Sequence, residues 1–325
     1  MLTGYSPYRR SSLRALGDLI YFGLKPGAYS ATSSGVLPRA DRWLSHTVVV
    51  SDRQTFEFEG CPLAYRLDGA GPPLVMIQGV GAYGTSPNPL TKILKEHYTC
   101  LSFDNRGMGA SQPAGRKLTV PQMARDTLAL LDHVGWDTSH VLGHSLGGLA
   151  AMELALLAKP RVRSLTLLNT FGRGADASRM TLKLLWILLR LRFGPHRMRR
   201  NAFMELVIPP GYTGDVESAA DQLSAVFGHD IADMAPASNL QLDAMKAHDV
   251  TGKLGKLSGI PTLVISGEND LIARPSSGRA IAEEIHGARY IEIPRASHSF
   301  PVMDPERCAA LVVEHIDEAE RRRKA

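Results

Sequence analysis

Cysteine is scarce in this chain of 325 residues, and the three that are present, Cys61, Cys100 and Cys308, lie far apart. An odd number at such spacing argues against a disulfide framework and fits a reducing compartment. The short Cys and His spacings of a zinc site are missing, so we expect no metal. No Gly-Lys-Ser/Thr follows a glycine-rich loop, and no Gly-x-Gly-x-x-Gly stands in the context of a dinucleotide site, so we expect no cofactor.

Long apolar runs are missing as well. No segment reaches the ~20 continuous apolar residues that a membrane span needs. Acidic residues are absent between Asp176 and Glu205, a stretch that carries seven Lys or Arg. Acid is also sparse at the N-terminus, and we define residues 1–45 as a basic arm. Its amphipathic, Arg-rich and Ser-rich sequence resembles a targeting segment or a membrane-surface helix, but we favour an arm packed against the main domain.

The net charge of +5 is therefore concentrated in the arm, in the 176–205 stretch and in the last residues of the chain. Basic residues without interleaved aromatics do not suit a single-strand binder, so we expect no nucleic-acid partner. Peripheral membrane contact through the arm or the 176–205 stretch stays open. We expect a cytoplasmic protein, with membrane association as the alternative, and the oligomeric state is left open.

Short continuous apolar runs bounded by glycine-rich loops are typical of strands that are covered on both faces, the condition of a parallel sheet. Helical patterns separate these runs, as in 119–134 and in a final helix from 305 to 321. Repeated strand and helix units predict an α/β fold with a doubly wound, mostly parallel sheet. Residues 55–59 and 62–68 instead alternate in period two around Gly60-Cys61, which predicts a hairpin of half-exposed strands. The other segments that we expect as strands are 73–77, 98–103, 162–168, 261–266 and 289–293.

One long segment interrupts the alternation of strands and helices, because no strong strand signal occurs between residues 171 and 260. An insertion of this length is too long for a simple loop. We predict a helical cap over 171–260, inserted into a core formed by 46–170 and 261–325. Within it, 180–193 is apolar on nearly all sides, which indicates a packed helix more often than a lipid contact.

The stretch Gly143-His144-Ser145-Leu146-Gly147 lies between an apolar run and a run rich in Ala and Leu. Gly-x-Ser-x-Gly at such a boundary is typical of a sharp strand-to-helix turn, which exposes the serine hydroxyl. The following helix places its unpaired N–H groups beside that hydroxyl. Ser145 is therefore our candidate nucleophile.

A serine needs a base within hydrogen-bond reach and a third group that orients the base. Asp270 and His298 follow the last two predicted strands, and the loops beyond the carboxyl ends of parallel strands converge. Asp176 is a second candidate for the acid, but its sequence context fits less well than that of Asp270.

The chain resembles the α/β-hydrolase superfamily, and most closely its capped serine esterases, enol-lactonases and related hydrolases. Four motifs in the right order carry this resemblance over residues 50–318: the segment 103–111, the turn at Ser145, Gly267 to Asp270, and Ser297-His298. The resemblance implies an eight-stranded sheet. It also implies that Ser145 is the nucleophile, that His298 is the general base and acid, and that Asp270 fixes the imidazole tautomer.

The same resemblance implies an oxyanion hole formed by the backbone N–H groups of Val80 and Leu146. The family's usual His-Gly is replaced here by Gln78-Gly79, and both residues are candidates to line the substrate pocket. Within the segment 103–111, Asp104 and Arg106 resemble a structural ion pair of the family.

Two further pocket candidates are His144 and Trp186. His144 precedes the nucleophile and would point away from a site that Ser145 faces, so a structural role is favoured for it. Trp186 belongs to the apolar 180–193 stretch of the predicted cap.

Together these features predict a hydrolase that cleaves a hydrophobic carboxylic ester or lactone through an acyl-serine intermediate. C–C bond hydrolysis, amide cleavage, acyl transfer and cofactor-free peroxide chemistry use the same triad and stay open. A non-catalytic ligand-binding protein of the same fold is the alternative from another class. Epoxide hydrolase and haloalkane dehalogenase chemistry are disfavoured, because a serine and not an aspartate occupies the turn.

Overall fold

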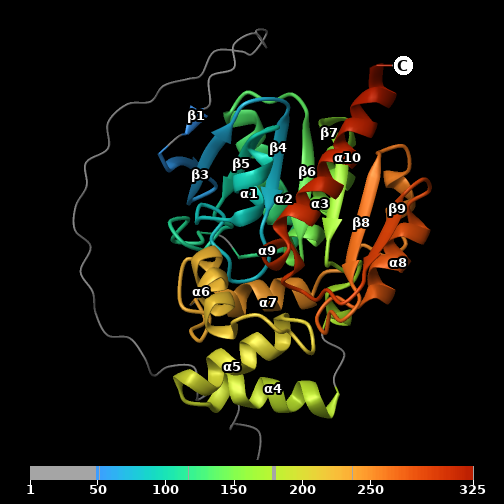
Figure 1. Cartoon of the computed structure of the whole chain (residues 1–325). Helices are drawn as coiled ribbons and strands as arrows, with labels where there is room; N and C mark the ends of the chain where they lie inside the picture. Colours follow the sequence, from blue (N-terminus) through green and yellow to red (C-terminus); the bar gives the residue numbers. More distant parts are fainter. Residues whose placement is uncertain (1–48, 51, 116, 178–180, 236, 325) are drawn as a thin grey trace, which may run out of the picture. The chain divides into compact units, whose positions relative to one another are not determined.

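The computed structural model describes residues 49, 50, 52–115, 117–177, 181–235 and 237–324 (Figure 1). The predicted arm, 1–45, lies outside the described residues. Among the described residues, no helix is long and apolar enough to cross a membrane.

A single mostly parallel sheet runs through the structure (Figure 1). Its strands lie in the order β1-β3-β5-β4-β6-β7-β8-β9, and β2 pairs with β3 beside β1. From β5 to β9 all neighbours are parallel, whereas β1, β2 and β3 are antiparallel to their partners. This confirms the predicted fold class. The strands are β1 (Val49–Val50), β2 (Gln54–Phe58), β3 (Cys61–Gly69), β4 (Pro73–Ile77), β5 (Thr99–Phe103), β6 (Ser139–His144), β7 (Val162–Leu168), β8 (Thr262–Gly267) and β9 (Arg289–Ile293).

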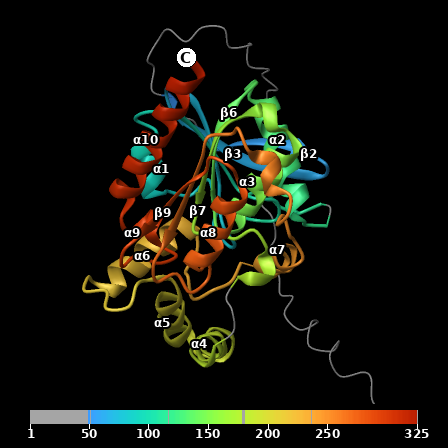
Figure 2. The same ribbon diagram turned by 90° about the vertical axis from the view of Figure 1, so that its right-hand side faces the viewer.

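The central strands are buried because helices cover both faces of the sheet (Figure 2). One face packs on α2 (Val120–His133), α3 (Leu146–Leu157) and α8 (Pro275–Glu284). The other face packs on α1 (Pro89–Leu94), α9 (Phe300–Met303) and α10 (Pro305–Lys324). Two apolar layers on one sheet explain why β4 consists of buried apolar residues without polar alternation.

Local sequence signals place the helix and strand ends close to their predicted positions. Thr119 caps α2, because its Oγ1 accepts a hydrogen bond from the N–H of Gln122 at 3.2 Å, and Pro121 lies in the first turn. The turn between β2 and β3 has Glu59 and Gly60 at φ values of 46° and 73°, which matches the twist of a tight hairpin.

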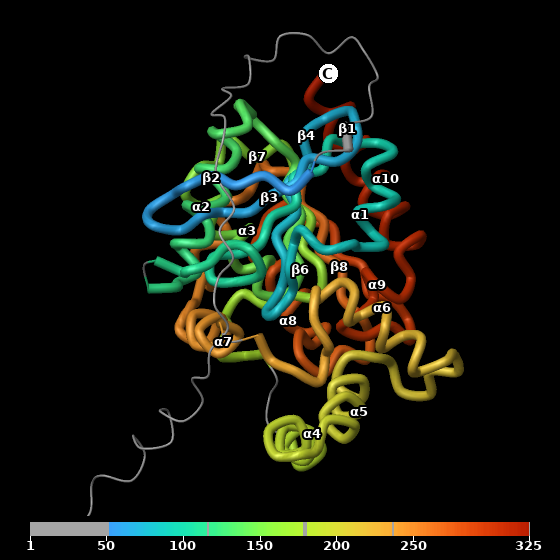
Figure 3. The backbone as a smooth tube through the Cα atoms, turned by 90° about the vertical axis from the view of Figure 1, so that its left-hand side faces the viewer, coloured from blue at the N-terminus to red at the C-terminus, as the bar shows by residue number. Residues whose placement is uncertain are grey.

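Between β7 and β8 the described residues form helices and loops (Figure 3). We refer to α4–α7 as the cap helices; a separate domain at 171–260 stays a prediction. Short 3₁₀ turns occur in this segment at Gly174–Asp176 and Leu254–Leu257, and another, Lys159–Arg161, precedes β7. The cap helices are α4 (Leu182–Phe193), α5 (His196–Val207), α6 (Val216–Phe227) and α7 (Ser238–Lys246).

Candidate active site

Ser145 lies at the turn between β6 and α3, with φ 55° and ψ −121°. Such angles are strained for a residue with a side chain, so its surroundings must hold the turn. A Cβ at Gly143 would lie 2.4 Å from the carbonyl oxygen of Gly147, and a Cβ at Gly147 would lie 2.0 Å from that of Ile77. Both positions that flank the serine therefore admit only glycine.

Hydrogen bonds from the neighbouring strand hold this strained turn. The N–H of Ser145 donates to the carbonyl of Leu168 at 3.0 Å, and the hydroxyl of Thr170 donates to the carbonyl of Ser145 at 2.7 Å. Ser145 is 5% exposed and lines a cavity of about 470 Å³. The turn thus presents the serine to an enclosed space and not to bulk solvent.

Asp270 and His298 are in direct contact, although 28 positions separate them in the sequence. The Nδ1 atom of His298 lies 2.7 Å from Oδ2 of Asp270. The other carboxylate oxygen accepts from the N–H groups of Ile272 and Ala273, both at 2.8 Å. An ionised carboxylate only accepts, so His298 carries its proton on Nδ1, and Nε2 is left as an acceptor. His298 lines the same cavity as Ser145.

The backbone of His298 is held from two sides. Its carbonyl oxygen accepts from Nε2 of His144 at 3.1 Å and from Nδ2 of Asn169 at 3.0 Å. Asn169 also donates to the carbonyl of Ser297 at 2.9 Å, and its Oδ1 accepts from the N–H of Gly267 at 2.9 Å. One buried amide thus joins the end of β7, the end of β8 and the loop that carries His298.

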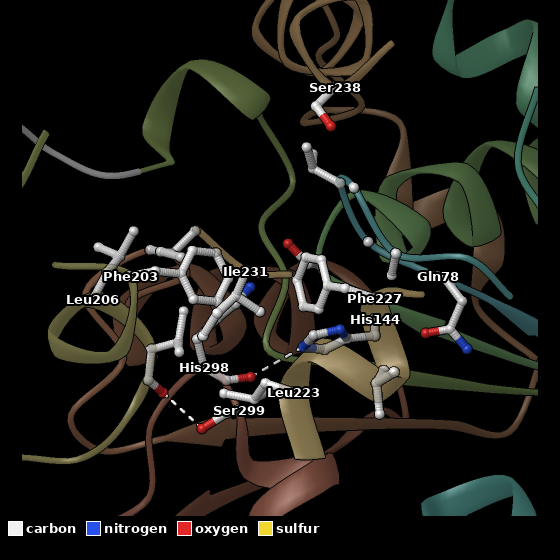
Figure 4. Close-up of a pocket in the computed structure, with 18 of the residues that line it drawn as sticks. Gln78, His144, Phe203, Leu206, Leu223, Phe227, Ile231, Ser238, His298 and Ser299 are labelled. Atoms are coloured by element: carbon white, nitrogen blue, oxygen red, sulfur yellow. Dashed lines mark hydrogen bonds between the residues drawn. The ribbon is translucent and has the colours of Figure 1, made fainter. Parts of the chain in front are cut away.

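His144, a pocket candidate that we expected to point away from the site, lines the cavity and also contacts the His298 loop. Burial and the neighbouring His298 lower its pKa to about 3. His144 is therefore neutral at physiological pH, and its Nε2–H is a donor to the His298 carbonyl. The two imidazole centroids are 4.9 Å apart, and Figure 4 shows the bond between the residues.

The loop after β4 lies directly against the serine. Gln78, Gly79 and Val80 line the cavity, and a Cβ at Gly79 would be 3.0 Å from Cβ of Ser145. The side chain of Asn105 donates to the Gln78 carbonyl at 3.0 Å, which fixes the loop from the end of β5. No helix begins in this loop, since α1 starts only at Pro89.

The N–H of Gly81, in the same loop, donates to Oε1 of Gln241 at 2.9 Å. Gln241 is fully buried and belongs to α7. This bond ties the loop beside Ser145 to a cap helix.

The cap helices close the cavity with apolar side chains. The rings of Phe203 and Phe227 pack edge to face with centroids 5.3 Å apart, in the same cavity as His144 and His298 (Figure 4). Apolar residues also reach the cavity from the sheet. The cap residues that line it include Leu188, Leu191, Phe203, Leu206, Val207, Leu223, Val226, Phe227, Leu242 and Met245.

The expectation that Trp186 lines the pocket is wrong. Its side chain is 60% exposed and is not among the cavity residues. On α4 the side that packs inward carries Leu184, Ile187, Leu188 and Leu191. With 3.6 residues per turn, Trp186 falls on the opposite side of the helix.

The ion pair expected between Asp104 and Arg106 is also wrong. Arg106 binds Asp126 of α2 instead, with Nε and Nη2 at 2.9 and 2.6 Å from the carboxylate. Asp104 accepts from the backbone and hydroxyl of Thr85 at 2.9 and 3.0 Å and from the N–H of Ala110 at 2.8 Å. Each charge is thus satisfied by a different partner, and both groups are buried.

Asp176, the other candidate acid, forms an ion pair with Arg173 at 2.9 Å, and its side chain is 44% exposed. Two residues that organise the site were not found from the sequence, Asn169 and Gln241. Asn169 had a signal, because it is the first polar residue after the carboxyl end of an apolar strand. Gln241 had none, since it lies on a helix without a distinctive motif. Among the described residues, no cluster of His, Cys, Asp or Glu side chains is arranged to hold a metal ion.

Comparison with known proteins agrees with this geometry. The family model for the alpha/beta hydrolase fold matches residues 72–305. A relative from Azorhizobium caulinodans, named for the carbamate hydrolase RutD, is 28% identical over 247 residues, which is 75% of this chain and 91% of that one. Haloalkane dehalogenase 2 of Mycobacterium bovis is 29% identical over 76% of this chain and 88% of that one.

Among solved structures, the enol-lactonase from Burkholderia xenovorans LB400 is similar with a TM-score of 0.66 and 26% identity. The match covers 79% of this chain and 97% of that one. The names of these proteins refer to several different reactions. They support hydrolytic activity but do not indicate which type of bond this chain cleaves. The sheet order, the strained turn at Ser145 and the family match over most of the sequence lead to one conclusion: the chain belongs to the α/β-hydrolase fold family.

Proposed function

We propose that this protein is a serine hydrolase that cleaves a hydrophobic carboxylic ester or lactone through an acyl-serine intermediate. The observation that carries the proposal is the meeting of two features at one cavity. Ser145 faces the cavity from a strained turn, and His298, bound to Asp270, faces it from another loop. A serine hydroxyl is a weak nucleophile, so acyl transfer to it requires a base and a group that orients the base.

In the proposed reaction, Nε2 of His298 takes the proton of the Ser145 hydroxyl while Oγ attacks the substrate carbonyl carbon. The C–O bond to the alcohol then breaks, and His298 returns the proton to the leaving oxygen. Water, deprotonated by the same imidazole, then attacks the acyl carbon. The bond from this carbon to Oγ breaks, the acid leaves, and His298 returns the proton to Ser145. Asp270 stabilises the imidazolium that forms in each half-reaction.

The oxyanion of each tetrahedral intermediate would be held by the N–H groups of Val80 and Leu146. Leu146 is the first residue of α3, where backbone N–H groups have no partner within the helix. The positive end of the helix dipole adds to this stabilisation. The close approach of Gly79 to Ser145 supports the placement of Val80, the next residue, beside the reacting carbonyl.

The cavity supports a hydrophobic substrate. Its volume of about 470 Å³ suits a small organic molecule, and its cap side is mostly apolar. Gln78 and His144 add polar groups near the serine, and these are suited to orient an ester group within an otherwise apolar space. The enol-lactonase among the similar structures supports a lactone as one form of that substrate.

The test compares Ser145→Ala with the wild type on p-nitrophenyl esters. Turnover should fall by about three orders of magnitude or more, because triad residues act as a unit. Ser276→Ala is a matched control, since Ser276 is exposed on α8. Wild-type turnover in Ser145→Ala would contradict the mechanism.

A chain-length panel tests the substrate class. Hydrolysis should rise from acetyl to longer acyl esters, since each added methylene is transferred from water into an apolar space. Equal rates at all chain lengths would argue against the hydrophobic substrate. A matched amide and a matched lactone in the same panel separate the bond types.

A further inference from the structure

Helix α4 carries a continuous apolar stripe on its outer side. We call this stripe the outer face of α4. Its members are spaced three or four positions apart or adjacent, so they share one side of the helix. Among the described residues ten large apolar side chains are exposed, and half of them belong to this stripe. The exposed fractions are 88% for Leu182, 43% for Leu185, 60% for Trp186, 42% for Leu189 and 76% for Phe193.

The residues of the outer face are not part of the apolar cluster that holds the cap helices together. The opposite side of the helix supplies the buried contacts, through Leu184 and Ile187, and α4 packs on α5 at the edge of the fold (Figure 1, Figure 3). A contiguous exposed apolar patch is costly in water and marks an interaction site more often than an ordinary surface. The outer face is therefore a candidate binding surface.

Positive charge surrounds the outer face. Arg192 and Arg197 are exposed, and neither has a carboxylate partner among the described residues. Arg190 lies 5.8 Å above the ring of Trp186 and is also bound to Glu205. The sequence from 177 to 204 contains no acidic residue, and Glu205 of α5 pairs with Lys183 and Arg190 of α4. Arg192 and Arg197 therefore leave net positive charge at the C-terminal end of the stripe.

We propose that the outer face of α4 docks on a phospholipid bilayer with anionic headgroups. Leu and Phe side chains suit the acyl boundary, and Trp186 suits the interface, where an apolar ring with one polar N–H is favoured. Arg192 and Arg197 then reach the headgroup phosphates, each contributing to electrostatic attraction. The chemistry matches that of helices which lie in the plane of a membrane surface.

Charge also decides against two other occupants. A second copy of this chain offers no acidic side chain on its own outer face, so Arg192 and Arg197 would gain no carboxylate partner there. Residues 1–43 hold six Lys or Arg against two Asp, so this segment is repelled by the same field. An anionic lipid surface is complementary to both the apolar stripe and its basic border.

Docking at this face would join the bilayer to the cavity. Leu188, Leu191 and Arg192 line the cavity from the same helix that carries the outer face. A hydrophobic substrate dissolved in the bilayer would therefore need to pass α4 to enter the cavity that Ser145 lines. This consequence rests on the proposed function, whereas the docking itself does not.

The experiment is sedimentation of the full chain with vesicles of phosphatidylcholine alone and with phosphatidylglycerol added. Binding should be at least about tenfold stronger to the anionic vesicles and should weaken with salt, since exposed charges are screened. Trp186→Asp combined with Phe193→Asp should lower binding at least about tenfold. Leu157→Asp, on a side chain that is 53% exposed on α3, is the matched control and should bind as the wild type does.

Two further readouts separate the outcomes. Brominated lipids should quench tryptophan fluorescence in the wild type, and Trp186→Phe should remove that quenching. Hydrolysis of p-nitrophenyl butyrate should be unchanged in the double Asp variant, because neither side chain lines the cavity. This activity also shows that the variant is folded. If the wild type and all variants fail to hydrolyse the ester, the proposed function is contradicted. The vesicle-binding result then still tests the docking proposal.

Three results would overturn the docking proposal. The first is no binding of the wild type to anionic vesicles. The second is equal binding by the wild type and the double Asp variant, which would place the contact elsewhere, for example in the first 48 residues. The third is a dimer that dissociates in the double Asp variant while no vesicle binding occurs, which would identify a second copy as the occupant.

Discussion

Replacement of Asn169 tests whether one buried amide positions the base. The side chain makes three hydrogen bonds, two donated by Nδ2 to the carbonyls of Ser297 and His298 and one accepted by Oδ1 from the N–H of Gly267. Asn169→Ala removes all three. The His298 carbonyl keeps its bond to His144, and the Ser297 carbonyl keeps the bond from the N–H of Phe300, so the Gly267 N–H is the group that loses its partner in a buried region.

The expected cost follows from these contacts. A buried polar group without a partner costs about 1–3 kcal/mol, and one such group, the Gly267 N–H, remains, so the free energy of unfolding should fall by about 1–3 kcal/mol. Asn169 also has φ 44°, and an alanine in this left-handed region adds about 1 kcal/mol. Asn169→Gly avoids the backbone penalty and separates it from the loss of hydrogen bonds.

Activity should change more than stability alone explains. Because the His298 loop loses an anchor at the base itself, kcat on a p-nitrophenyl ester should fall by about 10–100-fold, with a smaller change in KM. Asn169→Asp keeps the size and the acceptor but turns a carboxylate oxygen toward two carbonyls, so it should be impaired as well. Urea unfolding and steady-state kinetics measure both effects. Wild-type stability and kcat in Asn169→Ala would refute the role of this amide.

Three other changes probe the burial, the turn and the cavity. Burial lowers the pKa of His140 to about 3 and that of His315 to about 4, so both side chains stay neutral in the folded protein. In the unfolded chain each histidine has its ordinary pKa near 6.5 and binds a proton below that pH. Stability from these groups is complete above about pH 6.5 and is lost as the pH falls, so urea unfolding should show a loss on the order of 1–2 kcal/mol per histidine between pH 7.5 and 5. Gly147→Ala should abolish activity and lower the melting temperature, because its Cβ would lie 2.0 Å from the Ile77 carbonyl oxygen. Leu223→Trp fills part of the cavity and should lower kcat/KM for a long acyl ester at least about tenfold more than for an acetyl ester.

Matched controls keep these tests specific. The pH dependence should become shallower in His140→Asn and should not change in His286→Asn, since His286 is exposed. Gly255→Ala should be tolerated, because the nearest atom to its added Cβ lies at 3.7 Å. Identical pH profiles in the two histidine variants, an active Gly147→Ala enzyme, or an unchanged chain-length preference in Leu223→Trp would each contradict the corresponding argument.

Local pattern was enough to predict the sheet. β4 begins and ends where the continuous apolar run does, because a central strand covered on both faces is mostly apolar. β7 also has the predicted bounds, although it contains Arg163, Ser164 and Thr166. The glycines around Ser145 were informative for a similar reason, since the turn leaves no space for a Cβ at either position. The contact of His298 with Asp270 followed from topology, which brings the carboxyl ends of neighbouring strands together.

Contacts that depend on tertiary packing were not predictable in the same way. The rotation of α4 placed Trp186 outside, and a helix that is apolar on nearly all sides gives no pattern that would fix this rotation. The partner of Arg106 lies on α2, 20 positions away, and nothing in the segment 103–111 indicates it. Asn169 joins three segments that are distant in sequence, so only their arrangement in space shows its role.

Covalent labelling by a fluorophosphonate, read by mass spectrometry of the digested protein, tests the central claim most directly. The probe reacts with a serine whose hydroxyl is activated by a neighbouring base, so it reports on Ser145 without knowledge of the substrate. We expect one phosphonate on the peptide that contains Ser145, with labelling strongly reduced in His298→Ala and absent in Ser145→Ala. No labelling of the folded wild type, or equal labelling of wild type and His298→Ala, would contradict the proposed serine hydrolase.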